Sequence, residues 1–459
     1  MLPVAPPPPP PPPAWIAPHP CRAPAWRDGR PASIDSVTSD VYPLRVHWGP
    51  GGDPSKAAEI LEYLELAWAV QVDQLGFRPP TLPDDAAGPE LDVYLAPVGA
   101  YQAWVDPISW EDVTPGDGYS SAPVYVVIDE DLPEEWIPTY TVHEFNHVLQ
   151  FATDFTETAL NFWEATAVAA QKWTLDVDGR WDLDVPYFQE APWAPTLVGD
   201  SYYLWREYEV GWTFEYGAAL WMLHLDEVLG DGDGSVGPAL WEAAANEGWG
   251  DEPDAVDAIL AVSGQDLGAM LNGVARSRWL TGENWDARGL ADAAGWDEER
   301  AVPIETELTA ADLPVHLGFE HGPMITGQAF VTLDATEIDA DLVIGATSSR
   351  GLQSGLLVLA WHIDGTTAEH TAVGTTAAIR LDSSDIERLV IAVSNLGPMG
   401  WDGSDYPYVP GDQVLHVRTD AEGEGTKPCG CDTSSPKMWT PFLLSPLVLA
   451  RRRRVTPPQ

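Results

Sequence analysis

From residue 143 to residue 150 the sequence reads His143-Glu144-Phe145-Asn146-His147-Val148-Leu149-Gln150. Residues four positions apart project from the same face of a helix, so a helix over this stretch presents both histidines to one ion. Zinc accepts that geometry, and Glu144 lies beside it, where a carboxylate can reach a water molecule without binding the metal. The pattern predicts a helix that supplies two zinc ligands and a general base.

A third ligand is expected downstream, in the segment Asn161-Phe162-Trp163-Glu164-Ala165-Thr166-Ala167, which has the pattern of the start of a second helix. The loop at 152–160 is long enough to turn that helix back across the first, which favours Glu164. Glu157 is the alternative, although it follows His147 too closely to lie on a returning helix. Two neutral histidines and one carboxylate leave the fourth zinc position open, as in catalytic sites. The competing interpretation is two solvated histidines and a surface glutamate.

The composition describes an acidic chain that is large enough for two folded domains. Of its 459 residues 45% are hydrophobic, which is sufficient for two cores. The balance of 71 acidic against 23 basic side chains gives a net charge of -48, which repels phosphate backbones and argues against a nucleic-acid partner. The charge also suits a protein that works outside a cell. Cys21, Cys429 and Cys431 cannot form a disulfide framework, so the fold must depend on its apolar core.

The first two parts of the chain are distinguished by their sequence patterns. Residues 1–40 contain a proline run at 6–13 and are expected to be leader and linker, although no basic start or apolar stretch marks a signal peptide. Residues 41–302 combine strand-like and helical patterns and are expected to be one domain. Strands are predicted at 42–48, 91–96 and 124–128, and helices at 57–75, 157–174, 214–229 and 255–281. Gly264 and Gly268 are expected to break the last helical stretch.

The two remaining parts follow a change of texture near residue 300. Residues 303–420 contain short Val, Ile and Leu runs at 328–333, 342–346, 355–363, 388–393 and 414–417, which are typical of an antiparallel β-sandwich. Residues 421–459 are expected to be a linker and tail. Their apolar stretch at 439–450 is shorter than the roughly 20 residues of an unaided helical membrane span.

A family resemblance accompanies the histidine motif. Residues 143–150, followed by Trp163-Glu164-Ala165-Thr166-Ala167, resemble the gluzincin metallopeptidases, and among them the secreted bacterial and myxobacterial enzymes related to immune inhibitor A. The resemblance covers approximately residues 45–290 and includes 57–80, 92–95 and 216–221. It implies that His143, His147 and Glu164 bind zinc, that Glu144 activates water, and that an edge strand, here 124–128, pairs with an extended substrate above the zinc helix.

Other residues of the site are less well defined by the sequence. Peptidases of this broad class often use a Tyr or His that donates to the oxyanion, and Tyr216 is our candidate, with His224 as the second choice; either could instead be a packed residue. Val168 stands where the commonest gluzincins carry an Asp that orients a histidine. Some polar partner is nevertheless expected for each imidazole. Asp154 and Asn161 are possible partners.

Two further signals concern calcium and the cell envelope. The segment Asp231-Gly232-Asp233-Gly234-Ser235 with Glu242 partly matches a calcium-binding loop, but Val236 replaces the turn glycine, and an ordinary acidic turn explains it equally. The tail, with Cys429-Gly430-Cys431, a short apolar segment and an arginine run at 451–454, resembles the C-terminal sorting tails of myxobacterial surface proteins. That resemblance implies export and retention at the cell envelope; the alternative is a disordered end with a basic tip.

Together these patterns predict an α+β protein: a zincin-like metallopeptidase domain, made of a small sheet and a mainly helical lobe, followed by the β-sandwich. The expected function is a zinc-dependent endopeptidase that hydrolyses protein or peptide substrates at or outside the cell surface. Two other functions stay open, namely a zinc hydrolase of a non-protein amide or ester and a non-catalytic surface binding protein on a peptidase scaffold. The sandwich could bind substrate or simply cover the catalytic domain.

Overall fold

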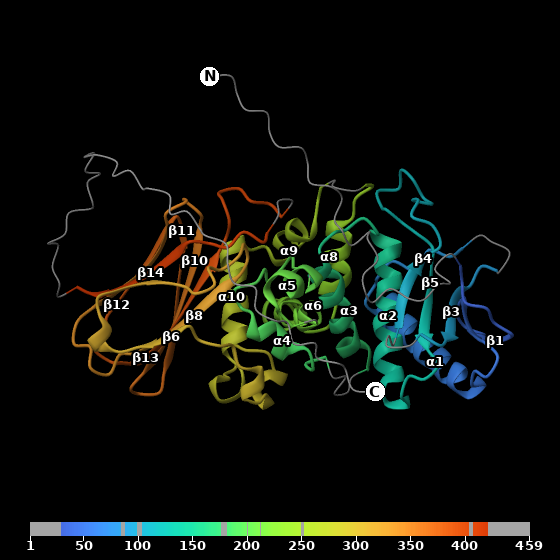
Figure 1. Cartoon of the computed structure of the whole chain (residues 1–459), viewed down its shortest axis with the longest axis horizontal. Helices are drawn as coiled ribbons and strands as arrows, with labels where there is room; N and C mark the ends of the chain where they lie inside the picture. Colours follow the sequence, from blue (N-terminus) through green and yellow to red (C-terminus); the bar gives the residue numbers. More distant parts are fainter. Residues whose placement is uncertain are drawn as a thin grey trace, which may run out of the picture. The chain divides into compact units, whose positions relative to one another are not determined.

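Five short strands near the start of the described chain form a mixed sheet (Figure 1). The computed structural model describes residues 29–83, 88–98, 103–175, 181–199, 201–211, 213–248, 252–403 and 407–420. The strands are β1 (Asp35–Thr38), β2 (Leu44–Trp48), β3 (Leu91–Ala96), β4 (Ala103–Pro107) and β5 (Val124–Asp129), in the spatial order β1-β2-β3-β5-β4. Strands β2, β3 and β5 are parallel, whereas β1 and β4 pair antiparallel at the two edges.

Two expectations about this sheet are wrong. Residues 35–38 lie within the expected leader and linker, but they form β1 and pair with β2. Strand β5, expected at an edge, lies between β3 and β4 and is buried along its whole length. Its continuous run of Val and Ile fits a strand covered on both faces. The edge strand on that side is β4, which is only partly buried and ends at Pro107, a residue that edge strands tolerate.

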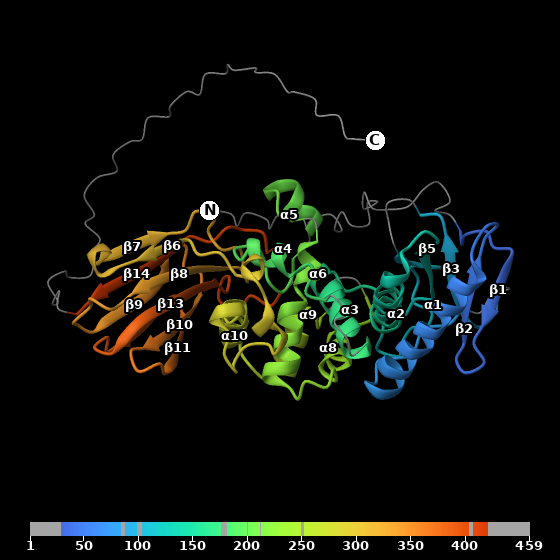
Figure 2. The same ribbon diagram turned by 90° about the horizontal axis from the view of Figure 1, so that it is seen from below.

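Two helices pack against one face of this sheet (Figure 2). Helix α1 (Pro54–Ala67) continues as the π-helix η2 (Trp68–Gln74), and α2 (Ile137–Thr153) lies beside α1. The side chain of Asp53 begins α1 by accepting a hydrogen bond from the Ser55 amide. Ile60 of α1 and Phe145 of α2 join Val126 of the sheet in a common core, because apolar residues at helical spacing share one face. Helix α2 is thereby held with its histidines turned away from the sheet core.

The next part of the chain is helical. Its helices lie between the first sheet and the C-terminal strands (Figure 1): α3 (Leu160–Leu175), α4 (Val185–Glu190), α5 (Ser201–Tyr208), α6 (Phe214–Gly217), α7 (Ala219–Leu223), the π-helix η4 (His224–Leu229), α8 (Val236–Ala244), α9 (Ala255–Ser263) and α10 (Leu267–Trp279). Gly264, with a φ of 64°, ends α9 as expected, because a left-handed residue at this position favours glycine. Gly268 lies within α10 and breaks nothing.

The last strands form two sheets that share a core. One sheet has the order β11-β10-β13-β8-β6 and the other β12-β9-β14-β7. Their strands are β6 (Thr306–Leu308), β7 (Val315–Gly318), β8 (Gln328–Asp334), β9 (Leu342–Ser348), β10 (Ser354–His362), β11 (Thr367–Gly374), β12 (Thr376–Leu381), β13 (Ile386–Asn395) and β14 (Gln413–Thr419). Val331, Ile344 and Leu415 belong to this core. The chain is therefore α+β. One pair, β6 with β8, is parallel and not antiparallel as expected, because the chain crosses to the other sheet in β7 between them.

The outer face of the first of these two sheets is also covered. Phe330, Leu357 and Val390 project from it into a cluster with Ala275 and Trp279 of α10. This explains why β10 and β13 are apolar almost throughout, since both of their faces are buried. The described residues belong to one compact unit. Among the described residues, no helix is both long and apolar enough to cross a membrane. The predicted tail, residues 421–459, lies outside the described residues.

Candidate metal centre

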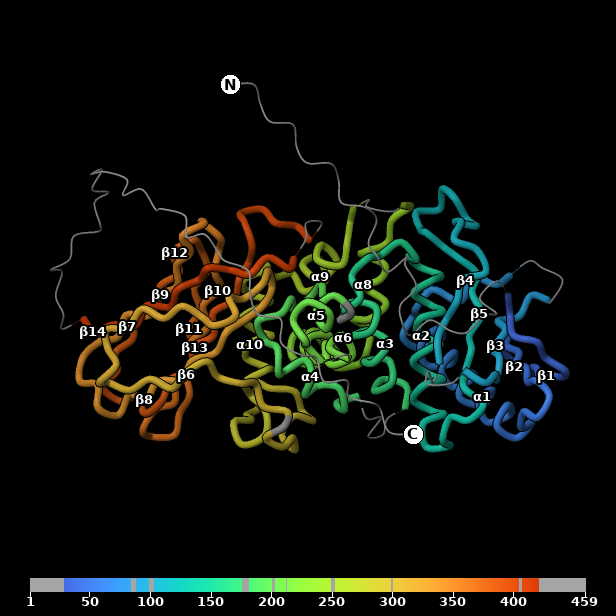
Figure 3. The backbone as a smooth tube through the Cα atoms, viewed as in Figure 1, coloured from blue at the N-terminus to red at the C-terminus, as the bar shows by residue number. Residues whose placement is uncertain are grey.

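Helices α2 and α3 lie side by side after the chain turns back between them (Figure 3). This turn brings His143, His147 and Glu164 together. The Nε2 atoms of the two histidines are 3.0 Å apart, and Glu164 Oε2 lies 3.1 Å from His143 Nε2 and 3.4 Å from His147 Nε2. The sequence-predicted ligand set is thus adjacent in space, on two different helices, with little of each side chain exposed to water.

The spacing of these three atoms suits a tetrahedral ion. Ligand atoms at about 2.0–2.1 Å from zinc lie roughly 3.3–3.4 Å from one another in a tetrahedron. The separations of 3.0, 3.1 and 3.4 Å therefore need only small adjustments. Two imidazoles with one carboxylate form a donor set that zinc favours, and they leave a fourth position for water or substrate. The residues present fit the ion that the sequence predicts.

The electrostatics of the three side chains are strongly coupled. Burial works against the charged form of His147, but the Glu164 carboxylate outweighs it and raises the pKa of His147 to about 9. Burial also opposes ionisation of Glu164, yet the two imidazoles hold its pKa far below the usual range. Glu164 is therefore ionised. A bound dication would stabilise its negative charge in the same way as the imidazoles do.

Glu144 directly follows His143 on α2. It is almost completely buried, with 6% of its surface exposed. Burial raises its pKa, and nearby His143 and His147 act in the opposite direction. The Glu164 charge reinforces the effect of burial. Glu144 thus lies within the electrostatic reach of all three candidate ligands, as a base that acts beside the ion must.

Tyr216 stacks on the candidate ligand His143, with ring centroids 5.6 Å apart and an interplanar angle of 16°. The negative charge of Glu164, together with burial, raises the pKa of Tyr216 well above its ordinary value. Its hydroxyl therefore keeps its proton and can donate a hydrogen bond.

The close approach of α6 to α4 depends on Gly217, where a Cβ atom would lie 2.3 Å from the Asp184 carbonyl oxygen.

The second choice, His224, lies in a packed environment. It is fully buried, and its Nδ1 is 2.9 Å from the Ser277 hydroxyl on α10. Burial lowers the pKa of His224 to about 3, so the ring stays neutral. The same packing excludes any side chain at Gly273, where a Cβ atom would lie 2.5 Å from His224 Nε2. His224 is thus a neutral core histidine that helps α10 to pack.

The alternative ligand Glu157 is directed elsewhere. Its Oε1 accepts a hydrogen bond from the Ala159 amide at 2.7 Å. Burial raises the pKa of Glu157 to about 7, the Ala159 amide lowers it, and the nearby Asp154 charge raises it further. Among the described residues, Glu157 does not belong to any group of His, Cys, Asp and Glu side chains that could hold a metal.

The polar partners of the imidazoles differ from the two residues suggested by the sequence. Asp154 binds Thr156, and Asn161 donates to the carbonyl oxygens of Pro195 and Thr196. Glutamines occupy both partner positions instead: Gln150 contacts His147, and Gln171 contacts His143. Gln150 follows His147 by three positions on α2, so helical spacing could have identified it. Gln171 comes from α3, and only the helix pairing reveals it.

The predicted calcium loop does not gather its carboxylates. Glu242 accepts a hydrogen bond from the Tyr119 hydroxyl at 2.6 Å, and Asp233 accepts one from the Ser235 amide at 3.0 Å. In the part of the chain that is described, the second group with metal-binding spacing is Glu252, Asp254 and Asp257, which consists of acids alone.

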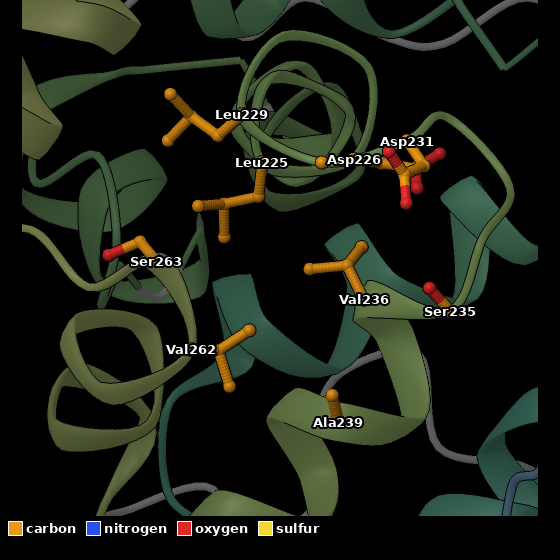
Figure 4. Close-up of a pocket in the computed structure, with 10 residues that line it drawn as sticks. Leu225, Asp226, Leu229, Asp231, Ser235, Val236, Ala239, Val262 and Ser263 are labelled. Atoms are coloured by element: carbon orange, nitrogen blue, oxygen red, sulfur yellow. The ribbon is translucent and has the colours of Figure 1, made fainter.

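A separate hollow of about 210 Å³ lies between η4, α8 and α9 (Figure 4). Its walls are mainly apolar, and Asp226 and Asp231 lie at its side. None of the candidate zinc ligands lines it, nor does Glu144 or Tyr216. It is therefore separate from the candidate metal centre.

Comparisons with known proteins give a partial structural likeness. Part of the chain resembles the pre-peptidase C-terminal domain of a collagenase from Bacillus anthracis, in a 1.0 Å crystal structure. The two are 13% identical, the match covers 25% of this chain and 97% of that domain, and the TM-score is 0.17. No protein-family model matches the chain, and no curated protein matches it. A likeness at this level carries no argument about function.

Proposed function

We propose that this protein is a zinc-dependent endopeptidase of the gluzincin type, with a zincin-like catalytic region formed by the first sheet and the helices. The observation that carries the proposal is the convergence of His143, His147 and Glu164 within 3.0–3.4 Å of one another, beside the buried carboxyl of Glu144. Three such ligands with an open fourth position are the pattern of hydrolytic zinc sites, whereas structural sites are closed.

Each residue of the centre then has a role in hydrolysis. Zinc held by His143, His147 and Glu164 would polarise the scissile carbonyl and lower the pKa of a water molecule. Glu144 accepts the proton of the attacking water and later delivers it to the leaving amine. Tyr216, whose hydroxyl stays protonated, donates to the oxygen that becomes negative as the carbonyl is attacked. The reaction requires no covalent intermediate with the protein.

The substrate would bind as an extended strand along β4. Among the described strands, β4 is at the edge of this sheet, with β5 as its one neighbour. It also contacts α2, the helix that carries both histidines. A peptide added to β4 would place its backbone beside this helix through main-chain hydrogen bonds, which accept many sequences. We therefore transfer the predicted substrate contact from residues 124–128 to β4.

The proposed setting is the cell surface or the medium, with protein or peptide substrates and no nucleic-acid partner. The net charge of -48 supports the absence of a nucleic-acid partner, because it repels phosphate backbones. Envelope attachment would depend on the tail at 421–459. The buried outer face of the first sandwich sheet favours a covering role for these strands over a purely separate binding module.

Metal analysis of the purified protein, combined with a casein assay, tests this function. We expect about one zinc per chain, loss of casein cleavage on chelation and its recovery with added zinc. Glu164→Ala should lower the zinc content, whereas the exposed substitution Glu62→Gln on α1 should not. Cleavage that survives complete removal of metal would contradict the mechanism. Hydrolysis of small esters without casein cleavage would indicate a different hydrolase.

A further inference from the structure

Three buried amide side chains form a hydrogen-bonded chain that ends at His147. Gln150 Oε1 lies 2.6 Å from His147 Nδ1, and Gln150 Nε2 donates to Asn146 Oδ1 at 2.8 Å and to the Trp163 carbonyl oxygen at 3.0 Å. Asn146 Nδ2 donates in turn to Gln71 Oε1 at 3.0 Å. All three side chains are fully buried, so water does not compete for these bonds. We call Gln71, Asn146 and Gln150 the amide chain.

The Trp163 carbonyl group fixes the orientation of the Gln150 amide. A carbonyl oxygen can only accept hydrogen bonds, so the NH2 group of Gln150 must face Trp163 and its Oε1 must face His147. Because Oε1 also only accepts, His147 must present a proton on Nδ1. In the neutral ring this leaves the lone pair on Nε2, which is the nitrogen that faces His143 and Glu164. The amide chain therefore selects the tautomer that can bind a metal.

Gln150 also connects the two helices that carry the ligands. It lies on α2 with both histidines, while its Trp163 contact is on α3, immediately before Glu164. The far end of the amide chain is anchored to the same helices, because Gln71 Nε2 contacts Val142 O and Thr174 Oγ1, both at 3.3 Å. The Gln150 side chain thus connects the ring of His147 to the backbone carbonyl group that directly precedes Glu164.

We propose that Gln150 is the positioning residue of the metal centre, which holds His147 in its metal-binding tautomer and sets Glu164 opposite it. This inference rests on the proposed zinc function. Many zinc-bound histidines donate to a carboxylate, which raises the basicity of the ligand. A neutral amide orients the ring without adding negative charge, so more of the ion's positive charge stays available to polarise a substrate.

Zinc affinity in competition with a chelator of known strength tests the proposal. Gln150→Met removes all three hydrogen bonds at nearly constant volume and should weaken zinc binding roughly 10- to 100-fold. Gln150→Glu restores an acceptor for His147 Nδ1 and should recover part of that loss. The matched control is Gln189→Met. Gln189 is equally buried and donates to the carbonyl oxygens of Arg278 and Arg300, but it contacts no candidate ligand, so zinc affinity should stay that of the wild type.

The outcomes separate this inference from the function beneath it. Wild-type protein that binds no zinc would remove both proposals. Zinc binding by the wild type with an unchanged affinity in Gln150→Met, or an equal loss in Gln189→Met, would remove only the role of Gln150. If Gln150→Met fails to fold, nitrogen NMR of the zinc-loaded wild type decides the matter. We expect a proton on Nδ1 of His147 that exchanges slowly, because buried Gln150 Oε1 accepts its hydrogen bond. A proton on Nε2, or an Nδ1 proton that exchanges as fast as that of a solvent-exposed histidine, would overturn the inference.

Discussion

Glu157→Gln should make the protein more stable at neutral and higher pH without changing its zinc content. The wild-type carboxyl is buried, and its pKa is raised from 4.5 to about 7, chiefly by burial. A raised pKa means that the folded state holds this proton more tightly than the unfolded state does. The stability that the protonated form contributes is therefore complete below about pH 4.5 and is lost as the pH rises through 7. Glutamine removes the ionisation and keeps an oxygen for the Ala159 amide.

The magnitude follows from the size of the pKa difference. A difference of about 2.5 units corresponds to about 3 kcal/mol at 1.36 kcal/mol per unit, and most of it develops between pH 5 and pH 8. Urea unfolding of wild type and Glu157→Gln at these two pH values measures it. We expect the difference in unfolding free energy between the two proteins to grow by roughly 2–3 kcal/mol from pH 5 to pH 8.

Two outcomes would refute this reasoning. Parallel pH profiles for the variant and the wild type would show that the Glu157 carboxyl is not held in its neutral form. Loss of zinc from Glu157→Gln would show that Glu157, and not Glu164, completes the metal centre. Glu62→Gln on the exposed face of α1 is the control, and it should change neither the pH dependence of stability nor the zinc content.

Two further predictions concern catalysis. Glu144→Gln should retain zinc but lower kcat by about 100-fold or more, because it removes the general base while keeping the shape of the side chain. Turnover of a casein-derived peptide within a few fold of the wild-type rate would exclude Glu144 as the base. Tyr216→Phe should keep the stacking on His143 and the zinc affinity, but it should lower kcat by roughly 10²-fold with little change in KM. An unchanged kcat would show that Tyr216 is a packing residue only.

The sequence predicted the two helices that carry the candidate zinc ligands better than it predicted the contacts around those helices. The positions of α2 and α3 followed from helical spacing, which is a local property of the chain, and the motif restricted the ligand candidates to Glu164 and Glu157. The return of α3 across α2 could only be expected from the loop length. Which acid completes the group is decided by this packing: Glu157 turns to the Ala159 amide, and Glu164 turns to the histidines.

The errors concern an edge strand and the polar partners of the two imidazoles. Strand β4 was not predicted, because Ala103–Pro107 is short and contains a polar residue and a proline, so β5 was placed at the edge. The expected imidazole partners, Asp154 and Asn161, are short polar residues, whereas the partners in the structure are Gln150 and Gln171. Gln150 could have been identified from its helical spacing to His147, whereas Gln171 lies on α3 and is found only from the pairing of α3 with α2.

The sandwich sheet that contains β10 and β13 has apolar residues on both of its faces, one toward the other sheet and one toward α10. A recombinant fragment that stopped near residue 300 would therefore expose the Trp279 side of α10 and would tend to aggregate. A shortened version of this protein must therefore keep its C-terminal strands to remain soluble and folded.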